Sequence, residues 1–184
     1  MKKVMGSLVL AFACGATLAG CSKAEHEVSY ADTHASTPRV SACTPDQLKV
    51  TEGDGDAGAG SVYFSYTFTN TGDSTCTLTG TPGVKRISEG HGEIPPAVAP
   101  RSTEHSITLK PGEHAYLAIG LTNMGSDGSP YVTEECKPVA LQGLAITLDD
   151  NAAPLNVAHQ GYGCLTGIDK LEVQPFSTTS PSDG

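Results

Sequence analysis

SVYFSYTFTN, residues 61–70, decides the fold class, because its apolar and polar side chains alternate with a period of two. Successive side chains of a β-strand point to opposite faces, so this alternation predicts a strand with one buried face. The buried face would carry Val62, Phe64, Tyr66 and Phe68. The opposite face would carry Tyr63, Ser65, Thr67 and Thr69.

Turn signals follow this strand and recur along the chain. Asn70-Thr71-Gly72-Asp73 predicts a turn, and Thr75–Thr79 predicts the strand that returns from it. Thr81-Pro82-Gly83-Val84 predicts a second corner, and Lys110-Pro111-Gly112-Glu113 predicts a type II-like turn.

Further strands are predicted from short apolar segments between these turns. They are Ser106–Leu109, Ala115–Leu121, Leu144–Leu148, Leu155–Val157 and Leu171–Val173. No stretch of a dozen residues has a helical period. About seven short strands with frequent turns predict an all-β protein, an antiparallel immunoglobulin-like β-sandwich, although the tryptophan typical of antibody domains is missing.

Four cysteines lie in the predicted sandwich: Cys43, Cys76, Cys136 and Cys164. An even number of cysteines in an exported chain predicts two disulfides. We favour the pairs Cys43–Cys76 and Cys136–Cys164, which close local loops, but the sequence leaves the two crossed pairings open. No Cys-x-x-Cys pair supports a thiolate metal site.

The first 20 residues have the features of a lipoprotein signal peptide. Lys2 and Lys3 form a positive segment, an apolar segment follows, and Leu18-Ala19-Gly20-Cys21 matches a lipobox. We therefore expect cleavage before Cys21 and attachment of a diacylglyceryl group to its thiol. Two acyl chains suffice for stable anchoring, so the expected location is the extracytoplasmic face of the cell membrane.

Polar segments flank the predicted domain. Residues 21–42 are small and polar without apolar periodicity, and they predict a flexible tether. The sandwich would then span residues 43–176, and residues 177–184 would form a disordered tail.

The charge of the chain restricts its partners. The formal net charge is -9, and loss of Lys2 and Lys3 with the signal peptide makes it -11. Nucleic acids and anionic lipid surfaces both select clusters of Lys and Arg, so we expect no nucleic-acid partner. We expect contact with the membrane only through the lipid on Cys21, and we expect the partner to be an envelope protein or a small ligand.

Acidic residues and histidines are the potential metal ligands of the sequence. Asp54-Gly55-Asp56 with Glu52 suggests calcium, but the remaining EF-hand ligands are absent, so an acidic glycine-rich hairpin loop is the favoured interpretation. The six histidines lack paired spacing and are expected to be solvated surface residues. A metal site would instead require His105, His114 and His159 to converge within about 4–5 Å of one point.

No sequence pattern predicts an enzyme. Gly-x-Ser-x-Gly, Ser-x-x-Lys and His-Glu-x-x-His are all absent, so no catalytic residue and no cofactor site are assigned. A deep pocket with a His–carboxylate–Ser cluster would change that conclusion. Tyrosines could line a binding patch, but cross-strand packing is favoured for those on polar strand faces. Tyr63 and Tyr116 lie on such faces, and Tyr30, Tyr131 and Tyr162 lie in the tether or in loops.

Several motifs of the mature chain occur together. They are Cys43 with Leu48, Gly60-Ser61, Phe68–Gly72, Cys76–Val84, Leu109–Gly112, Cys136, Cys164 and Val173-Gln174-Pro175. In this combination, residues 43–176 resemble the domain of unknown function numbered four-two-three-two, common in exported proteins and lipoproteins of actinobacteria. The most specific piece is an Asn-Thr-Gly turn followed by Cys-x-Leu-x-Gly-x-Pro-Gly-Val. The resemblance implies a disulfide-bearing β-sandwich, often behind a lipobox, and it implies no established activity.

These observations together predict a cell-envelope lipoprotein whose non-catalytic β-sandwich is a binding or structural module. A metal-handling or sensory accessory lipoprotein is the alternative. An enzyme whose site is assembled from distant residues is the least favoured class.

The lipobox predicts that Cys21→Ala prevents lipid attachment, because alanine has no thiol to alkylate. The variant should be released from the membrane or accumulate as unprocessed precursor, which cell fractionation and immunoblotting would measure. Unchanged retention of a processed protein in the membrane fraction would contradict the predicted anchor.

Overall fold

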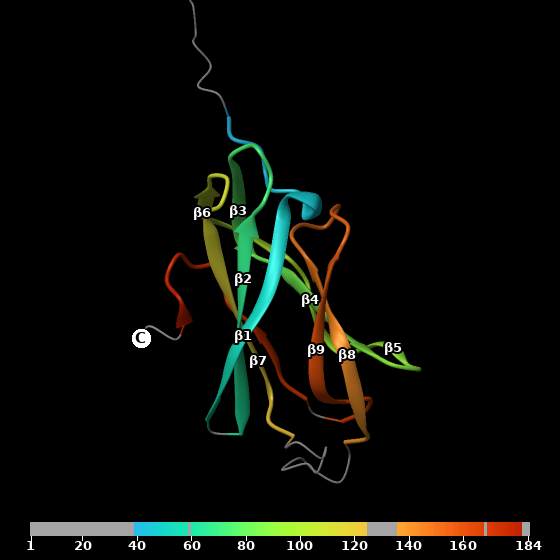
Figure 1. The fold of residues 1–184 in the computed structure, drawn as a ribbon. Coiled ribbons are helices and arrows are strands. Elements are labelled where there is room, and N and C mark those ends of the chain that lie inside the picture. Colours follow the sequence, from blue (N-terminus) through green and yellow to red (C-terminus); the bar gives the residue numbers. More distant parts are fainter. Residues whose placement is uncertain (1–38, 59, 125–135, 168, 182–184) are drawn as a thin grey trace, which may run out of the picture. The chain divides into compact units, whose positions relative to one another are not determined.

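The computed structural model describes residues 39–58, 60–124, 136–167 and 169–181, which form β-strands and one short 3₁₀ helix (Figure 1). The predicted signal peptide, Cys21 and the tether up to residue 38 lie outside the described residues. The elements are η1 (Pro45–Gln47), β1 (Leu48–Gly58), β2 (Ser61–Asn70), β3 (Cys76–Thr81), β4 (Gly83–Ser88), β5 (Gly92–Val98), β6 (Arg101–Leu109), β7 (His114–Thr122), β8 (Pro138–Thr147), β9 (Leu155–Cys164) and β10 (Leu171–Val173).

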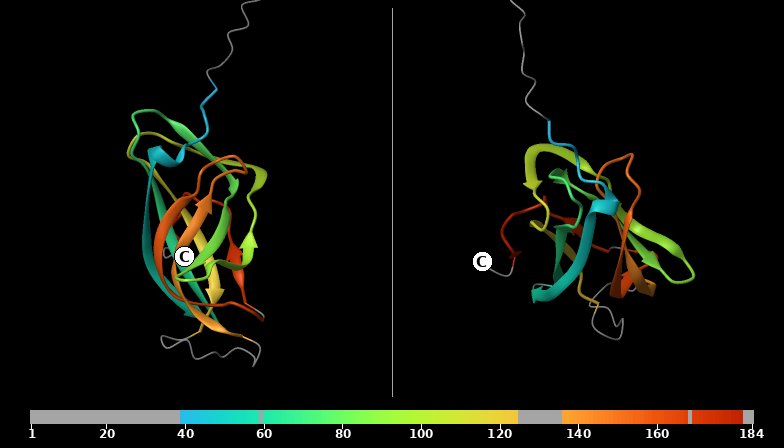
Figure 2. Two further views of the ribbon diagram at one scale, coloured as in Figure 1. Left: turned by 90° about the vertical axis from the view of Figure 1, so that its right-hand side faces the viewer. Right: turned by 45° about the horizontal axis from the view of Figure 1, so that its top comes forward.

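The strands form antiparallel sheets that pack face to face. One sheet has the order β1-β2-β7-β10, a second has the order β5-β4-β8-β9, and β3 pairs with β6. Strands β1, β2 and β7 lie on one side of the domain and β4, β8 and β9 on the other (Figure 1 and Figure 2). The core lies between them, since one apolar cluster joins Phe68 and Leu117 to Val84 and Ile146. The predicted all-β, antiparallel fold is therefore confirmed.

Strand β2 occupies the centre of its sheet, with β1 on one side and β7 on the other. Tyr66 and Phe68 are fully buried, as the alternation predicts. On β7, the predicted inward side chains Ala115, Leu117 and Ile119 are also fully buried. Val62 and Phe64, at the beginning of β2, are only half-buried, because this end of the strand faces a cleft.

The strand that follows the Asn70 turn does not return beside β2, and this part of the prediction is wrong. Strand β3 pairs instead with β6, and its Thr77 also forms a parallel bridge with Ala42. Both edges of β2 are already paired, so the chain must cross to another sheet. The predicted corner at Pro82 then carries it from β3 into β4.

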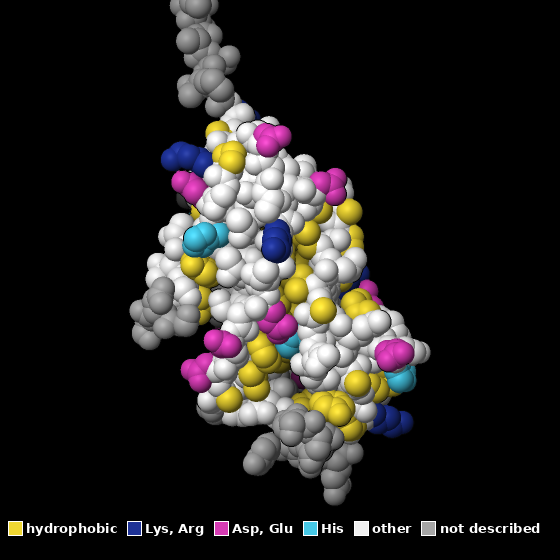
Figure 3. Space-filling model, in the orientation of Figure 1, with side chains coloured by type: hydrophobic (Ala, Val, Ile, Leu, Met, Phe, Trp, Pro, Cys, Tyr) yellow, Lys and Arg dark blue, Asp and Glu magenta, His cyan; other side chains and the backbone are white. Residues whose placement is uncertain are grey.

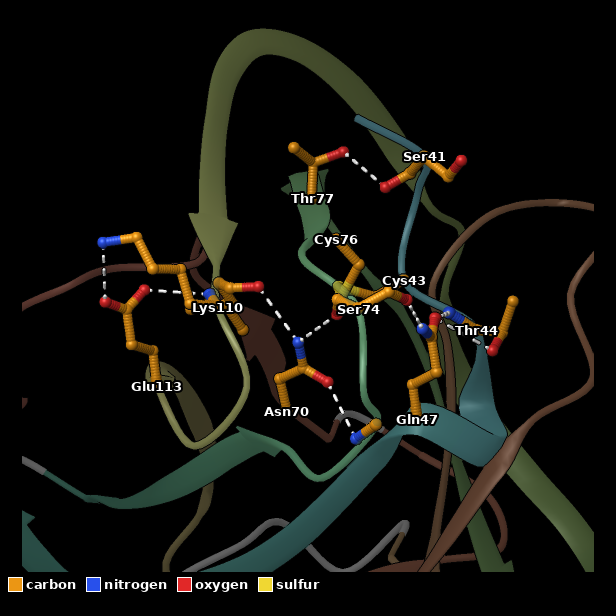
Figure 4. Close-up of a disulfide and its surroundings, with 12 residues drawn as sticks. Ser41, Cys43, Thr44, Gln47, Asn70, Ser74, Cys76, Thr77, Lys110 and Glu113 are labelled. Atoms are coloured by element: carbon orange, nitrogen blue, oxygen red, sulfur yellow. Dashed lines mark hydrogen bonds and ion pairs between the residues drawn. A yellow bond between two sulfur atoms is a disulfide. The ribbon is translucent and has the colours of Figure 1, made fainter. Parts of the chain in front are cut away.

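Asn70 holds this crossing in place. Its side chain is fully buried; its Nδ2 donates to the carbonyls of Ser74 and Leu109 at 2.9 and 3.0 Å, and its Oδ1 accepts from the Gly72 amide at 3.0 Å. Figure 4 shows the carboxamide between the β2–β3 turn and the end of β6, beside the Cys43–Cys76 bond (Figure 4). One side chain therefore joins the β2–β3 turn to the end of β6.

The turn at residues 110–113 is confirmed. The Glu113 amide donates to the Lys110 carbonyl at 2.9 Å, and Gly112 has a φ of 83°. A positive φ at the third residue is what a type II turn requires, and glycine adopts it without strain. The Gly112 amide also donates to the Asn70 carbonyl at 2.8 Å, which joins this turn to β2.

The acidic stretch at residues 52–56 is a strand and not the predicted loop. Residues Leu48–Gly58 all belong to β1, with a register shift between Glu52 and Gly55. A strand at a sheet edge needs only backbone partners on one side, so exposed acidic and glycine residues are compatible with it. Gly55 pairs with Phe64, and a Cβ at Gly55 would lie 2.8 Å from the Phe64 ring, so the glycine makes room for this ring.

Both favoured disulfides are present. Cys43–Cys76 and Cys136–Cys164 have Cα–Cα distances of 4.8 and 5.2 Å, within the usual range of disulfides. The first ties the segment before η1 to β3, and the second ties the chain before β8 to the last residue of β9. Each bond therefore joins two segments that already lie side by side.

A buried ion pair lies near the second disulfide. Arg86 on β4 contacts Asp169 and donates to the carbonyl of Pro95, and the Asp169 carboxylate accepts from the Cys164 amide at 2.7 Å. Both side chains are almost completely buried. Alternation of apolar residues predicts apolar side chains in the interior of a sheet protein. It does not predict a buried arginine, so the sequence did not indicate this ion pair.

The ends of the domain are paired with strands. At the end of the predicted tether, the Ser41 carbonyl accepts from Thr77, and Ser177, the predicted start of the tail, exchanges two backbone hydrogen bonds with Tyr116. Residues 38–184 form a compact unit of their own. Within the described part of the chain, no helix is long and apolar enough to cross a membrane.

We expect Asn70→Ala to lower the free energy of unfolding by about 2–4 kcal/mol, because the variant leaves two carbonyls and one amide without their partner. Asp73→Ala, at an exposed position of the same turn, is the matched control and should change stability by less than about 0.5 kcal/mol. Urea unfolding of the oxidised proteins measures both values. Equal effects of the two substitutions would show that Asn70 does not hold the crossing.

Candidate binding cleft

A cleft opens between the two larger sheets at the end where β2 begins. Its volume is about 700 Å³, within the range of small-molecule sites. The described lining residues are Ala57, Val62, Phe64, Leu121, Thr122, Asn123, Met124, Ala140, Leu141, His159, Gln160, Gly161 and Tyr162. Figure 3 shows hydrophobic side chains gathered along the boundary between β1 and β9, where this face is hollowed (Figure 3).

Apolar and polar side chains share the walls of the cleft, with Thr122, His159 and Gln160 among the polar ones. Val62, Phe64 and Leu121 come from the β2–β7 pair, and Leu141 comes from β8 on the opposite wall. Register pairing of Val62 with Leu121 places these two side chains next to each other. Apolar residues at the beginning of β2 therefore line the cleft, whereas those at its end fill the core.

A hydrogen-bonded group of three polar side chains adjoins the cleft through His159, which is one of its lining residues. His159 Nδ1 lies 2.6 Å from Glu52 Oε1, and the Tyr66 hydroxyl lies 3.1 Å from the same oxygen and 3.0 Å from Nδ1. The side chains of His159 and Glu52 are 2% and 29% exposed. The three come from β9, β1 and β2, so the group joins the two larger sheets.

The contacts define which nitrogen of His159 carries a proton. A carboxylate oxygen can only accept, so Nδ1 donates to Glu52 and the Tyr66 hydroxyl donates to the same oxygen. Burial, followed by the negative charge of Glu52 and its hydrogen bond, raises the pKa of Tyr66 well above its usual value. The phenol therefore keeps its proton, and in the neutral imidazole the lone pair lies on Nε2.

Nε2 is on the edge of the ring that faces Gly161. A Cβ placed at Gly161 would lie 3.4 Å from Nε2, and both residues line the cleft. The Phe64 ring meets the imidazole edge-on, with ring centroids 4.6 Å apart. Among the described residues, none forms a hydrogen bond with Nε2. The arrangement can therefore orient an imidazole and offer one acceptor atom to a molecule in the cleft.

The prediction that the histidines are solvated surface residues is wrong for His159. Leu155, Val157 and His159 alternate along β9, so the period of two would have placed the histidine inward. Glu52 was missed because β1 was interpreted as a loop, and Glu52 in fact pairs with Tyr66 in register. Tyr162 was placed in a loop and belongs to β9.

The other sequence-predicted candidates lie apart from this group. His105 and His114 are exposed, and the ring of His114 packs on Tyr116. Within the described ranges, no three His, Cys, Asp or Glu residues are placed to hold a metal ion. The described polar contacts of His159 are with Glu52 and Tyr66, and they include no serine.

The tyrosines on polar strand faces pack locally, as expected. Tyr63 pairs with Gly120, whose hypothetical Cβ would lie 2.7 Å from the Tyr63 ring. The ammonium of Lys170 lies 5.3 Å from the centroid of this ring and 3.1 Å from its hydroxyl. Tyr30 and Tyr131 lie outside the described residues.

Comparison with protein-family models matches residues 43–177 to one family, described as "Domain of unknown function (DUF4232)". The match covers most of the chain and agrees with the family resemblance that the sequence motifs indicate. No curated protein and no solved structure matches the chain.

The raised pKa of Tyr66 predicts a specific loss of stability in alkali. The unfolded chain releases the phenolic proton above about pH 10, and the folded chain does not. The stability that depends on the protonated phenol is therefore complete below about pH 10 and decreases as the pH rises above it. At pH 7, Tyr66→Phe should lower the free energy of unfolding by about 1–2 kcal/mol through loss of the bond to Glu52. This difference should shrink by about 1.4 kcal/mol at pH 11. Urea unfolding at both pH values measures it, and a constant difference would contradict the argument.

Proposed function

The chain belongs to the DUF4232 family, and we propose that this member is a lipid-anchored binding module of the cell envelope that holds a small ligand in its cleft. The observation that carries the proposal is the cleft with apolar side chains on both walls, which the Glu52–His159–Tyr66 group reaches through His159. Binding sites for small molecules combine apolar walls with a few oriented polar groups in this way.

The location rests on the sequence. The signal peptide and the lipobox at Cys21 support export and lipid attachment. Two disulfides within one domain suit an oxidising compartment. Since the net charge of the mature chain is -11, attraction to anionic lipid would not hold the domain at the membrane, and the acyl chains would have to do so.

The polar group supports a binding role without catalysis. Glu52 and Tyr66 both occupy the Nδ1 side of the imidazole, so they fix the ring and leave its other nitrogen toward the cleft. A Ser–His–carboxylate hydrolase also needs a hydroxyl nucleophile at that other nitrogen. Among the described contacts of His159 there is none. Orientation of a ligand is the role that these contacts support.

The proposal is tested by blocking the cleft in the chain from residue 22 onward, exported without lipid so that detergent does not compete. This chain contains the compact unit of residues 38–184 with both disulfides. The probe is N-phenyl-1-naphthylamine, an apolar dye whose fluorescence rises on leaving water. Saturable binding at about one dye per chain is expected.

Ala140→Trp should weaken dye binding by about tenfold or more, equivalent to about 1.4 kcal/mol, because Ala140 lines the cleft at an exposed position of β8. Ala97→Trp, at an exposed position of β5, is the matched control and should leave binding unchanged. Fluorescence titration measures both. Absence of saturable binding, or equal binding by Ala140→Trp and the wild type, would reject the cleft as the site.

A further inference from the structure

The ligand class follows from a buried acceptor that the cleft presents, Nε2 of His159. We propose that the cleft takes an uncharged molecule with an apolar body and a hydroxyl group, and that this hydroxyl donates a hydrogen bond to Nε2 of His159. The inference rests on the proposed function and specifies its ligand.

In the neutral imidazole, Nε2 is the acceptor, because Glu52 holds the ring proton on Nδ1. Nδ1 lies 2.6 Å from the Glu52 carboxylate, a distance typical of a strong charge-assisted hydrogen bond in which Nδ1 is the donor. The Tyr66 hydroxyl donates to the same carboxylate oxygen and holds it against the ring. A neutral imidazole with its proton on Nδ1 has a lone pair on Nε2, and a hydroxyl proton is its complement.

The charges around the cleft favour an uncharged ligand. None of the described lining residues is Lys, Arg, Asp or Glu, so this part of the lining offers no counter-ion to a charged group. The Glu52 carboxylate, in contact with His159, would repel an anion brought up to Nε2. Moving an unpaired charge from water into an apolar site is far more costly than moving a hydroxyl that gains a partner.

Apolar side chains on both walls set the other part of the ligand. Val62, Phe64 and Leu121 on one wall face Leu141 on the other, so an aromatic or aliphatic body would contact apolar side chains on both sides. A volume of about 700 Å³ accommodates a body of two or three fused rings or a comparable alkyl chain.

Gly161 keeps the approach to Nε2 open. His159 and Gly161 are two residues apart on β9 and therefore share a face of the sheet. Gly161 is not among the described glycines with a positive φ, so its backbone does not require glycine. A side chain there would lie against the imidazole edge, since the Cβ alone would be 3.4 Å from Nε2.

The test compares three fluorescent probes of one ring system on the exported chain from residue 22. They are 2-naphthol, which donates a hydrogen bond; 2-methoxynaphthalene, which cannot; and 2-naphthoate, which is an anion. In the wild type, 2-naphthol should bind about five- to tenfold more tightly than the methyl ether, the usual contribution of one hydrogen bond. 2-Naphthoate should bind at least about tenfold more weakly than 2-naphthol, and equal or tighter binding of the anion would overturn the uncharged class.

Two variants separate the hydrogen bond from the general affinity of the cleft for naphthalenes. His159→Phe removes the acceptor and keeps a ring, and Gly161→Val keeps the Glu52–His159–Tyr66 group and covers Nε2. In both, the ratio of the two neutral-probe affinities should fall by about five- to tenfold. Gly161→Val keeps the test decisive if His159→Phe does not fold, which circular dichroism would report.

The two proposals fail in different ways. Saturable binding of both neutral probes, with a ratio that neither variant changes, would overturn the role of His159 and leave the binding cleft standing. Absence of saturable binding by either neutral probe would overturn the proposed function itself.

Discussion

The buried carboxamide of Asn70 is the interaction on which the arrangement of the strands depends. It satisfies the carbonyl of Ser74 and the amide of Gly72 in the β2–β3 turn, and the carbonyl of Leu109 at the last residue of β6. Backbone groups without hydrogen-bond partners are costly where they are buried, so loss of this side chain would destabilise the β2–β3 turn and the end of β6. With it, β2 ends at a defined residue, and β3 begins in another sheet.

This placement gives the two ends of β2 different surroundings. Toward Asn70, Tyr66 and Phe68 are enclosed, and Phe68 packs edge-on against Phe176 at 5.1 Å between ring centroids. Toward Ser61, the sheets leave the cleft between them. Tyr66 lies at the boundary, with its ring in the core and its hydroxyl on Glu52 and His159. The polar group therefore lies where packed core gives way to open cleft.

The sequence predicted the strands whose side chains alternate and the turn at Gly112, because each depends on a local pattern. The two favoured disulfides were predicted because each closes a local loop of the chain. It missed β1, since an edge strand with one bulge does not need apolar alternation along its length. The pairing of β3 with β6 was also missed, because it depends on which edges of β2 are occupied. His159 and Glu52 are 107 residues apart, and only correct assignment of two strands could have brought them together.

The acidic edge formed by β1 has a consequence for a protein crowded at a membrane surface, as we propose for this one. An open sheet edge can pair with the edge of a neighbouring molecule, and tethering in two dimensions makes such encounters frequent. Along this edge the exposed Asp54 and Asp56 bring like charges together on approach, and the shift in register after Glu52 interrupts the straight ladder that a second strand would need. The stretch that lacks a regular strand pattern would thereby keep each copy separate from its neighbours.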